Sequence, residues 1–180
     1  MGKNFVGRAT LKLFNGYHLS PLKMDDRDAL VEHLVCKEIY DMTLSIPYPY
    51  KAADADDWIE KNHAELQYND KPLVMAIREA SGKCIGNIGF MKPVNGEAEL
   101  GYWLAKPYWG RGIVTEAAKA MCKRGFEIHG FKTIWATTVI GNSGSMRVLE
   151  KVGFKNEGQL KKPKLKDGKE ICLIGWSLRK

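Results

Sequence analysis

The chain has 180 residues, of which 44% are hydrophobic and 27% are charged, a balance typical of a globular protein with a buried core and not of a disordered chain. Its apolar runs are too short to span a membrane, and its N-terminus lacks the apolar stretch of a secretory signal, so we expect a soluble cytoplasmic protein. The net charge is +7, and residues 155–180 carry eight Lys or Arg against three Asp or Glu, a net +5.

Two helices are predicted in the N-terminal part of the chain, after a weakly alternating strand at residues 10–14. The first helix begins at Asp25 or Asp26, either of which can cap it, and the second begins near Asp54. The segment 46–50 between the two helices contains two prolines and therefore cannot be regular helix. The first predicted helix carries Leu30, Leu34 and Ile39 on one side, and the second has residues at helical spacing, namely Trp58, Ile59, Asn62 and Leu66.

Three strands follow, at residues 73–80, 84–91 and 97–104, with turns at 81–83 and at Asn95-Gly96. The strongest helix comes next and ends near Gly130, because apolar residues recur at intervals of three and four along it. They are Val114, Ala117, Ala118, Met121, Cys122 and Gly125.

The C-terminal part is predicted to contain a strand at residues 133–139, a helix at 142–152 capped by a left-handed Gly153, and a closing hairpin. The hairpin strands are expected at 155–166 and 171–178, around a turn at Asp167-Gly168. The order of elements is β-α-α-β-β-β-α-β-α-β-β, without an internal repeat or linker. We therefore predict one mixed α/β domain over residues 1–180.

The segment Trp109-Gly110-Arg111-Gly112 joins the third of the three strands to the strongest helix. A glycine-rich turn before a helix can bind an anion, because the first N–H groups of the helix have no partner within it and lie at the positive end of its dipole. A nucleotide P-loop would need Gly-Lys-Ser/Thr, and a dinucleotide fingerprint would need glycine where Thr115 stands. The glycines alone leave a phosphate site and a plain structural turn open.

The residues around this turn resemble the core of the GNAT acetyltransferases. Segments 99–104, 109–112 and 115–117 match that core, and Asn142, Ser145 and residues 151–154 continue the match in order. The resemblance spans nearly the whole chain and is greatest to the RimJ/RimL branch, whose named members acetylate the N-termini of ribosomal proteins. It implies a GNAT fold with a mostly antiparallel sheet of about seven strands, splayed between the fourth and fifth, and about four helices.

The resemblance also implies that acetyl-CoA is the co-substrate, that no metal is needed, and that the backbone N–H groups of residues 110–114 hold the coenzyme A pyrophosphate. Arg111 is either a charge-assisted contact to phosphate or a solvent-exposed side chain. Asn142 binds the coenzyme arm, caps the following helix, or does both. The implied coenzyme-binding residues are Trp103, Leu104, Trp109, Gly110, Arg111, Gly112, Ile113, Val114, Thr115, Asn142 and Ser145.

Amine acetylation requires a base for the amine, polarisation of the thioester carbonyl and a donor for the departing thiolate. The resemblance points to Glu99 as the base, with Glu97 on the same strand face as its rival, and to N–H groups near Trp103 and Leu104 for the oxyanion. Many family members use a tyrosine where this chain has Leu149. We therefore hypothesise that Ser145, one helical turn earlier, or a water that it binds, supplies the proton.

The acceptor pocket is expected between the early helices, the loop 46–50 and the closing hairpin. Its candidate residues are Met42, Tyr48, Tyr50, Trp58 and Glu97. The acceptor is expected to be a primary amine, either a protein N-terminus, such as that of a ribosomal protein, or a small molecule such as a polyamine or an aminoglycoside. An α-amine has a pKa near ~8 against ~10.4 for lysine, so it needs less help from a base.

Two other functions stay open: a GNAT domain that binds acyl-CoA as a sensor without turnover, and a nucleic-acid-binding module that uses the basic C-terminal segment. The second lacks an aromatic and basic motif of the RNP type, so a nucleic-acid partner is not expected. The four cysteines form no C-x-x-C pair and the four histidines have no metal-ligand spacing, so neither a metal site nor a covalent acyl-enzyme is expected. A monomer and a homodimer both fit the sequence.

Overall fold

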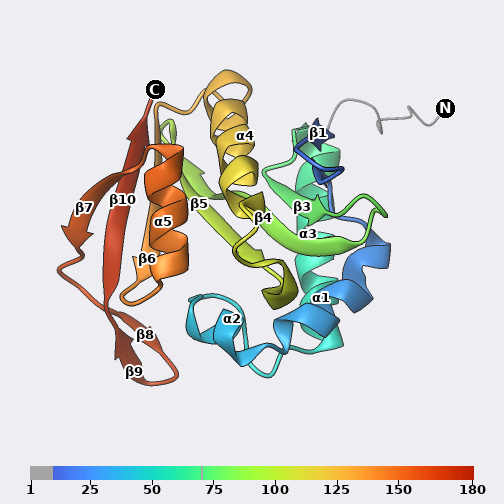
Figure 1. Ribbon diagram of the computed structural model, residues 1–180, viewed down its shortest axis with the longest axis horizontal. Helices are drawn as coiled ribbons and strands as arrows, with labels where there is room; N and C mark the ends of the chain where they lie inside the picture. Colours follow the sequence, from blue (N-terminus) through green and yellow to red (C-terminus); the bar gives the residue numbers. More distant parts are fainter. Residues whose placement is uncertain (1–9, 70) are drawn as a thin grey trace.

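The computed structural model describes residues 10–69 and 71–180, without the side chains of residues 64–69, and shows a twisted sheet with helices on both faces (Figure 1). The helices are α1 (Arg27–Leu34), α2 (Lys37–Asp41), α3 (Ala52–Asn69), α4 (Ile113–Glu127) and α5 (Ser143–Val152), with short 3-10 helices η1 (Met24–Asp26) and η2 (Lys106–Tyr108). The strands are β1 (Leu11–Lys12), β2 (His18–Ser20), β3 (Val74–Arg78), β4 (Cys84–Val94), β5 (Glu97–Leu104), β6 (Thr133–Val139), β7 (Lys155–Gln159), β8 (Lys164–Lys166), β9 (Lys169–Ile171) and β10 (Leu173–Arg179). None of the helices in these described ranges is long and apolar enough to cross a membrane.

The main sheet has eight strands in the order β1-β2-β3-β4-β5-β6-β10-β7, and β8 and β9 form a separate ribbon. Every pairing in the main sheet is antiparallel except that of β5 with β6. The predicted mixed α/β fold with a mostly antiparallel sheet is therefore confirmed. The expected single strand at residues 10–14 is instead a short hairpin of β1 and β2, which accounts for the eighth strand.

Strands β5 and β6 are joined only at one end. Their Cα partners run from Glu97 and Thr133 to Glu99 and Trp135 and stop there. Beyond this point β5 stays paired with β4 as far as Leu104, and β6 stays paired with β10. The sheet therefore divides into two halves after Glu99, which is the splay that the resemblance implied.

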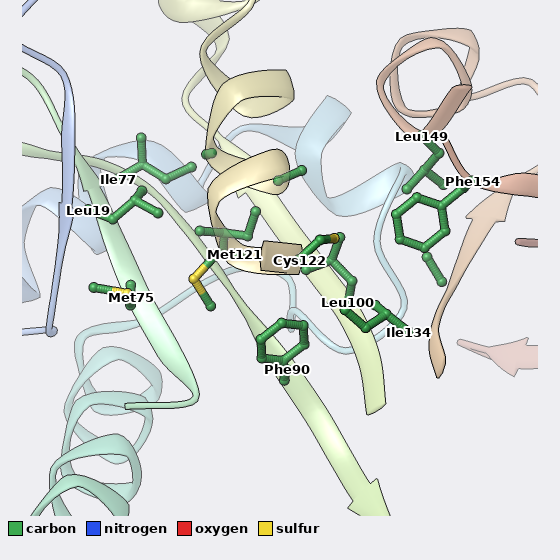
Figure 2. Close-up of a cluster of buried hydrophobic side chains, with 14 of the residues drawn as sticks. Leu19, Met75, Ile77, Phe90, Leu100, Met121, Cys122, Ile134, Leu149 and Phe154 are labelled. Atoms are coloured by element: carbon green, nitrogen blue, oxygen red, sulfur yellow. The ribbon is translucent and has the colours of Figure 1, made fainter. Parts of the chain in front are cut away.

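Two buried clusters hold the helices on the sheet, one on each face. Figure 2 shows the larger cluster, in which Met121 and Cys122 of α4 lie over the sheet and Leu149 of α5 lies beside Phe154. The smaller cluster packs α1 and α3 against the opposite face. Strand β5 supplies both clusters in alternation, with Leu100 facing the larger one and Trp103 facing the smaller one.

The single helix predicted to start at Asp25 or Asp26 and to include Ile39 is two helices. Helix α1 ends at Leu34, the backbone of Cys36 is extended with ψ of 114°, and α2 begins at Lys37. The sequence contains the reason, because Leu34 and Ile39 are five residues apart. This is not the spacing of three or four that places side chains on one helical face.

The predicted closing hairpin is also broken, on both of its sides. Strand β7 ends at Gln159, and Pro163, which has no N–H group to donate, precedes β8. The turn at Asp167-Gly168 forms as predicted, with positive φ at both residues. It joins β8 to β9 in the separate ribbon, whereas β10 returns to pair with β7 and β6.

The predicted caps of α5 are present. The Asn142 side chain accepts a hydrogen bond from the Ser145 backbone N–H at 3.1 Å, and Gly153 ends the helix with φ of 100°. Asn142 caps the N-terminus and fixes Ser145 in the first turn, and Gly153 caps the C-terminus.

We expect Gly125→Ala to destabilise the protein. A Cβ at this position of α4 would lie 2.7 Å from Phe90 Cζ and 3.0 Å from Ile134 Cδ1, so the helix or the rings must shift. Such overpacking should lower the free energy of unfolding by about 1–3 kcal/mol, measured by urea denaturation. The matched control is Gly144→Ala in α5, where the nearest atom is 3.8 Å from the added Cβ. An equal loss in both variants would contradict a packing effect.

Candidate active site

A cavity of about 1230 Å³ opens where β5 and β6 diverge, with residues of both strands in its walls. It extends from the turn before α4, past the N-terminal half of α5, to α3 and the loop at residues 42–47. Glu97 and Tyr48 lie outside it. The other residues predicted from the sequence line it: Met42, Tyr50, Trp58, Glu99, Trp103, Leu104, residues 109–115, Asn142 and Ser145.

The turn before α4 depends on two glycines in the left-handed conformation. Gly110 and Gly112 have φ of 76° and 77°, a conformation that costs residues with a Cβ roughly 1–2 kcal/mol. A Cβ at either position would meet no atom within 4 Å, so conformation and not space requires glycine. The Glu116 N–H donates to Gly112 O at 3.2 Å. The N–H groups before that of Glu116 therefore precede the hydrogen-bonded turns of the helix and lie at the positive end of its dipole.

Trp109 fastens this turn to the end of β5. Its indole Nε1 donates to the Leu104 carbonyl oxygen at 2.7 Å, and its ring lines the cavity. Arg111 is exposed beside it, with its guanidinium carbon 5.3 Å from the ring centre of Tyr108. Trp109 is therefore a structural clamp as well as a cavity wall, and Arg111 is held at the cavity edge by a cation–π contact.

Glu99 faces the cavity at the closed end of the gap between the strands. Its side chain is 17% exposed, and it accepts hydrogen bonds from Lys92 Nζ at 2.9 Å and from Thr137 Oγ1 of β6 at 3.4 Å. Glu97 is exposed and lies outside the cavity walls. The geometry therefore distinguishes two carboxylates that the sequence alone left as rivals.

Ser145 and Tyr102 form a hydroxyl pair on the cavity wall. Their oxygens are 2.8 Å apart, and both residues line the cavity. Burial raises the pKa of Tyr102 to about 12, so the phenol stays protonated at neutral pH and can donate to Ser145 Oγ. The Ser145 hydroxyl hydrogen is then available to another acceptor. Leu149, at the family's tyrosine position, is fully buried in the larger cluster.

Tyr102 was missed by the sequence analysis, although the sequence contains a signal for it. Strand alternation places Tyr102 on the same face as Leu100 and Leu104, toward the core. A phenol at a core-facing position usually needs a hydrogen-bond partner. The identity of that partner could not be read from the sequence, because it depends on how α5 packs across the gap.

The carboxylate and the hydroxyl pair come from opposite faces of β5. Glu99 and Tyr102 are three residues apart, an odd number that places their side chains on opposite faces. Tyr102 points toward α5, whose Ser145 it contacts, and Trp103 belongs to the cluster with α1 and α3. A molecule in the gap between β5 and β6 could therefore meet a base from one side and a donor from the other.

The far end of the cavity is walled by α3 and the loop at residues 42–47. Burial raises the pKa of Tyr50 above its ordinary value, and Trp58 Nε1 donates to Asn87 Oδ1 at 3.3 Å. Tyr48 packs on Tyr40, with ring centres 4.9 Å apart, and faces a second hollow of about 380 Å³. The ribbon of β8 and β9 borders that second hollow, and from the predicted closing hairpin Leu173 lines the main cavity.

The cysteines do not form part of the cavity wall. Cys84 and Cys122 are buried, and burial raises the pKa of each thiol to about 12, so they are protonated and weakly nucleophilic. None of the four cysteines lines the cavity. Within residues 10–69 and 71–180 there is also no group of three or more His, Cys, Asp or Glu placed to hold a metal ion.

The chain matches the model of the acetyltransferase (GNAT) domain over residues 17–155. It is 27% identical over 165 residues to an uncharacterized N-acetyltransferase, p20, of Bacillus licheniformis, covering 90% of this chain and 92% of that protein. It is 27% identical over 133 residues to the ribosomal-protein-serine acetyltransferase of Escherichia coli, covering 71% and 73% of the two chains.

The fold is similar to that of RimL, a ribosomal L7/L12 α-N-protein acetyltransferase solved in complex with coenzyme A. The TM-score is 0.81 at 16% identity, covering 94% of this chain and 97% of that chain. At that identity the likeness supports the fold alone. The family model, in contrast, covers well over half of the sequence, and the segments that suggested the resemblance lie within its span. The chain therefore belongs to the GNAT acetyltransferase family.

Proposed function

We propose that this chain transfers the acetyl group of acetyl-CoA to the α-amine of a protein N-terminus. One observation carries the proposal: a single cavity joins the N-terminus of α4 to a carboxylate and a hydroxyl pair that project from opposite faces of β5. An anion-binding helix end, a base and a hydrogen-bond donor are the parts that acetylation by a CoA thioester requires.

The donor is proposed to bind along the turn and the free edge of β5. The N–H groups of residues 110–114 bind the pyrophosphate, and Arg111 adds positive charge. The N–H groups near Trp103 and Leu104 polarise the thioester carbonyl. The Leu104 carbonyl already accepts from Trp109, and Asn142 Oδ1 already caps α5. The coenzyme arm therefore pairs with other groups, including the Asn142 Nδ2 amide.

Glu99 is proposed as the base, acting directly or through water. The amine must lose a proton before its nitrogen can attack the thioester carbon, because an ammonium has no lone pair. Glu99 lies in the cavity with 17% of its side chain exposed, so a substrate amine can approach it. The amine nitrogen forms the new bond to carbon, and the carbon–sulfur bond breaks as the intermediate collapses.

Ser145 is proposed to stabilise the departing thiolate, with Tyr102 holding it in position. The two hydroxyl oxygens are 2.8 Å apart, and in the proposed arrangement Tyr102 donates to Ser145 Oγ, which leaves the Ser145 hydroxyl hydrogen free to point into the cavity. A hydrogen bond to an ionised sulfur is stronger than one to a neutral thioester, so it favours the departing state. The attacking nitrogen gives up its second proton as the intermediate collapses, and the thiolate takes up a proton through the Ser145 hydroxyl or a water that it binds, so the products are CoA and the acetylated amine.

A protein N-terminus is proposed as the acceptor on two grounds. An α-amine has a pKa near ~8, so a larger neutral fraction exists at pH 7 than for a lysine amine near ~10.4. The Escherichia coli relative is named as a ribosomal-protein acetyltransferase. Lysine peptides, polyamines and aminoglycosides offer the competing amines, and a preference for any of them over N-terminal peptides would overturn this part of the proposal.

Glu99→Gln should lower kcat/KM for an N-terminal peptide by about 10²-fold or more at neutral pH, the usual contribution of a general base. The deficit should shrink as the pH rises past the pKa of the substrate amine, because more of the amine is then neutral without help. Thiol release from acetyl-CoA measures both effects. Glu97→Gln is the matched control and should stay near wild type. An unaltered pH–rate profile in Glu99→Gln would show that Glu97 or solvent acts as the base instead.

Gly112→Val should weaken coenzyme A binding more than Gly112→Asn, because asparagine tolerates the left-handed conformation better than a β-branched residue. The loss for valine should be roughly 5- to 30-fold in Kd, which corresponds to about 1–2 kcal/mol of backbone strain. Isothermal titration calorimetry with coenzyme A measures it. Equal affinity in both variants and wild type would show that the turn does not bind the coenzyme.

Tyr102→Phe and Ser145→Ala should each lower kcat about tenfold or more, the value of a hydrogen bond to a charged group, with little change in the KM for acetyl-CoA. The double variant should lose no more than Ser145→Ala alone, because Tyr102 acts through Ser145. Tyr17→Phe, a partly buried tyrosine packed on the same core, is the control. Additive losses, or unchanged turnover of Ser145→Ala at saturating acetyl-CoA, would contradict the arrangement.

A further inference from the structure

The ribbon of β8 and β9 and the residues just before it form a strongly basic element. We call residues 161–171 the lysine ribbon. It contains two acidic residues, Asp167 and Glu170, against five lysines. The lysines are Lys161, Lys162, Lys164, Lys166 and Lys169.

The lysine ribbon concentrates unpaired positive charge in a short stretch of chain. Some exposed lysines elsewhere pair with carboxylates, as Lys83 does with Glu32 at 2.9 Å and Lys119 with Glu116 at 2.8 Å. Within the described residues, no ion pair includes Lys161, Lys162, Lys164 or Lys169. All four are exposed, so the ribbon presents a positive field to solvent.

Lys166 fixes this element against the acceptor end of the site. Its Nζ donates to the Thr43 carbonyl at 2.6 Å and to the Tyr40 carbonyl, and it lies 3.4 Å from the centre of the Tyr40 ring. Two carbonyls and a ring face offset the cost of its partial burial. The ribbon is therefore attached to the segment between α2 and α3, and part of that segment lines the main cavity.

The second hollow connects the two regions. It lies between the tip of the ribbon and the loop, and residues 44–47 line both this hollow and the main cavity. A chain whose first residue sits in the main cavity and which leaves past this loop must therefore pass over the ribbon. A small amine held inside the main cavity would not reach it.

We infer that the acceptor is a polypeptide whose N-terminus is followed by an acidic segment, which the lysine ribbon binds. The inference rests on the proposed function, because it needs an α-amine in the main cavity. Charge complementarity carries it: unpaired cations beside the exit from an amine site attract carboxylates on the same acceptor chain. An anionic nucleic acid is the competing ligand for such a surface, and the test includes it.

The test compares peptides with the same first residues followed by glutamates, glutamines or arginines, in a thiol-release assay at low ionic strength. We expect kcat/KM to fall in the order Glu, Gln, Arg, and the Glu advantage to shrink as salt screens exposed charges. Replacing Lys161, Lys162 and Lys164 by Gln should remove a Glu advantage of about five- to tenfold, the order of three exposed charge pairs. Lys166 is kept, because it anchors the ribbon.

The matched control replaces Lys12, Lys123 and Lys132 by Gln, which removes the same charge from exposed lysines on other elements. It should keep the Glu advantage. Equal rates for all three peptides, or a Glu advantage that survives in the ribbon variant, would overturn the inference while leaving N-terminal acetylation intact. Acetylation of none of the peptides would overturn the proposed function itself. Equal peptide rates combined with ribbon-dependent binding of a labelled single-stranded RNA would assign the ribbon to nucleic acid instead.

Discussion

The site depends on one constraint, namely that the backbone pairing between β5 and β6 stops after Glu99. After Glu99 the two strands keep their outer partners but not each other. Backbone donors and acceptors left unpaired in a cleft are costly to shield from water. A ligand that carries its own amides can satisfy them, and the pantetheine arm of coenzyme A carries such amides. The break in the sheet is thus both the opening of the cavity and a reason for it to bind an amide-bearing ligand.

One continuous segment carries most of the proposed chemistry. Residues 97–115 form β5, the turn and the start of α4, and they contribute the carboxylate of Glu99, the phenol of Tyr102 and the helix end. The indole of Trp109 closes this segment on itself by donating to Leu104. Distances between the base and the anion-binding turn are therefore set within one short stretch of backbone and depend little on the packing of remote loops.

The sequence predicted those features that have a local cause. Gly110, Gly112 and Gly153 have positive φ where turns and caps were expected. The spacing on α4 predicted five of its buried residues, but Val114 is only partly buried, and the buried Ile113 and Thr115 were not predicted. Two breaks were missed although they also have local causes, at Cys36 and at Pro163. The choice between Glu99 and Glu97 and the pairing of Tyr102 with Ser145 depend on how β6 and α5 lie against β5, which no local pattern specifies.

The sites that we propose for the donor and for the acceptor lie on different parts of the molecule. The donor side belongs to the main sheet, α4 and α5, where each position is fixed by core packing, as at Gly125 and Leu149. The acceptor side belongs to the loop at residues 42–50 and the lysine ribbon, which contact each other through Lys166 and lie outside the main sheet. Substitutions there change the shape and charge met by an incoming amine without disturbing the gap between β5 and β6. A scaffold divided in this way can keep one thioester chemistry while its acceptor changes, and our proposals accordingly place donor binding at the turn before α4 and acceptor recognition at the ribbon.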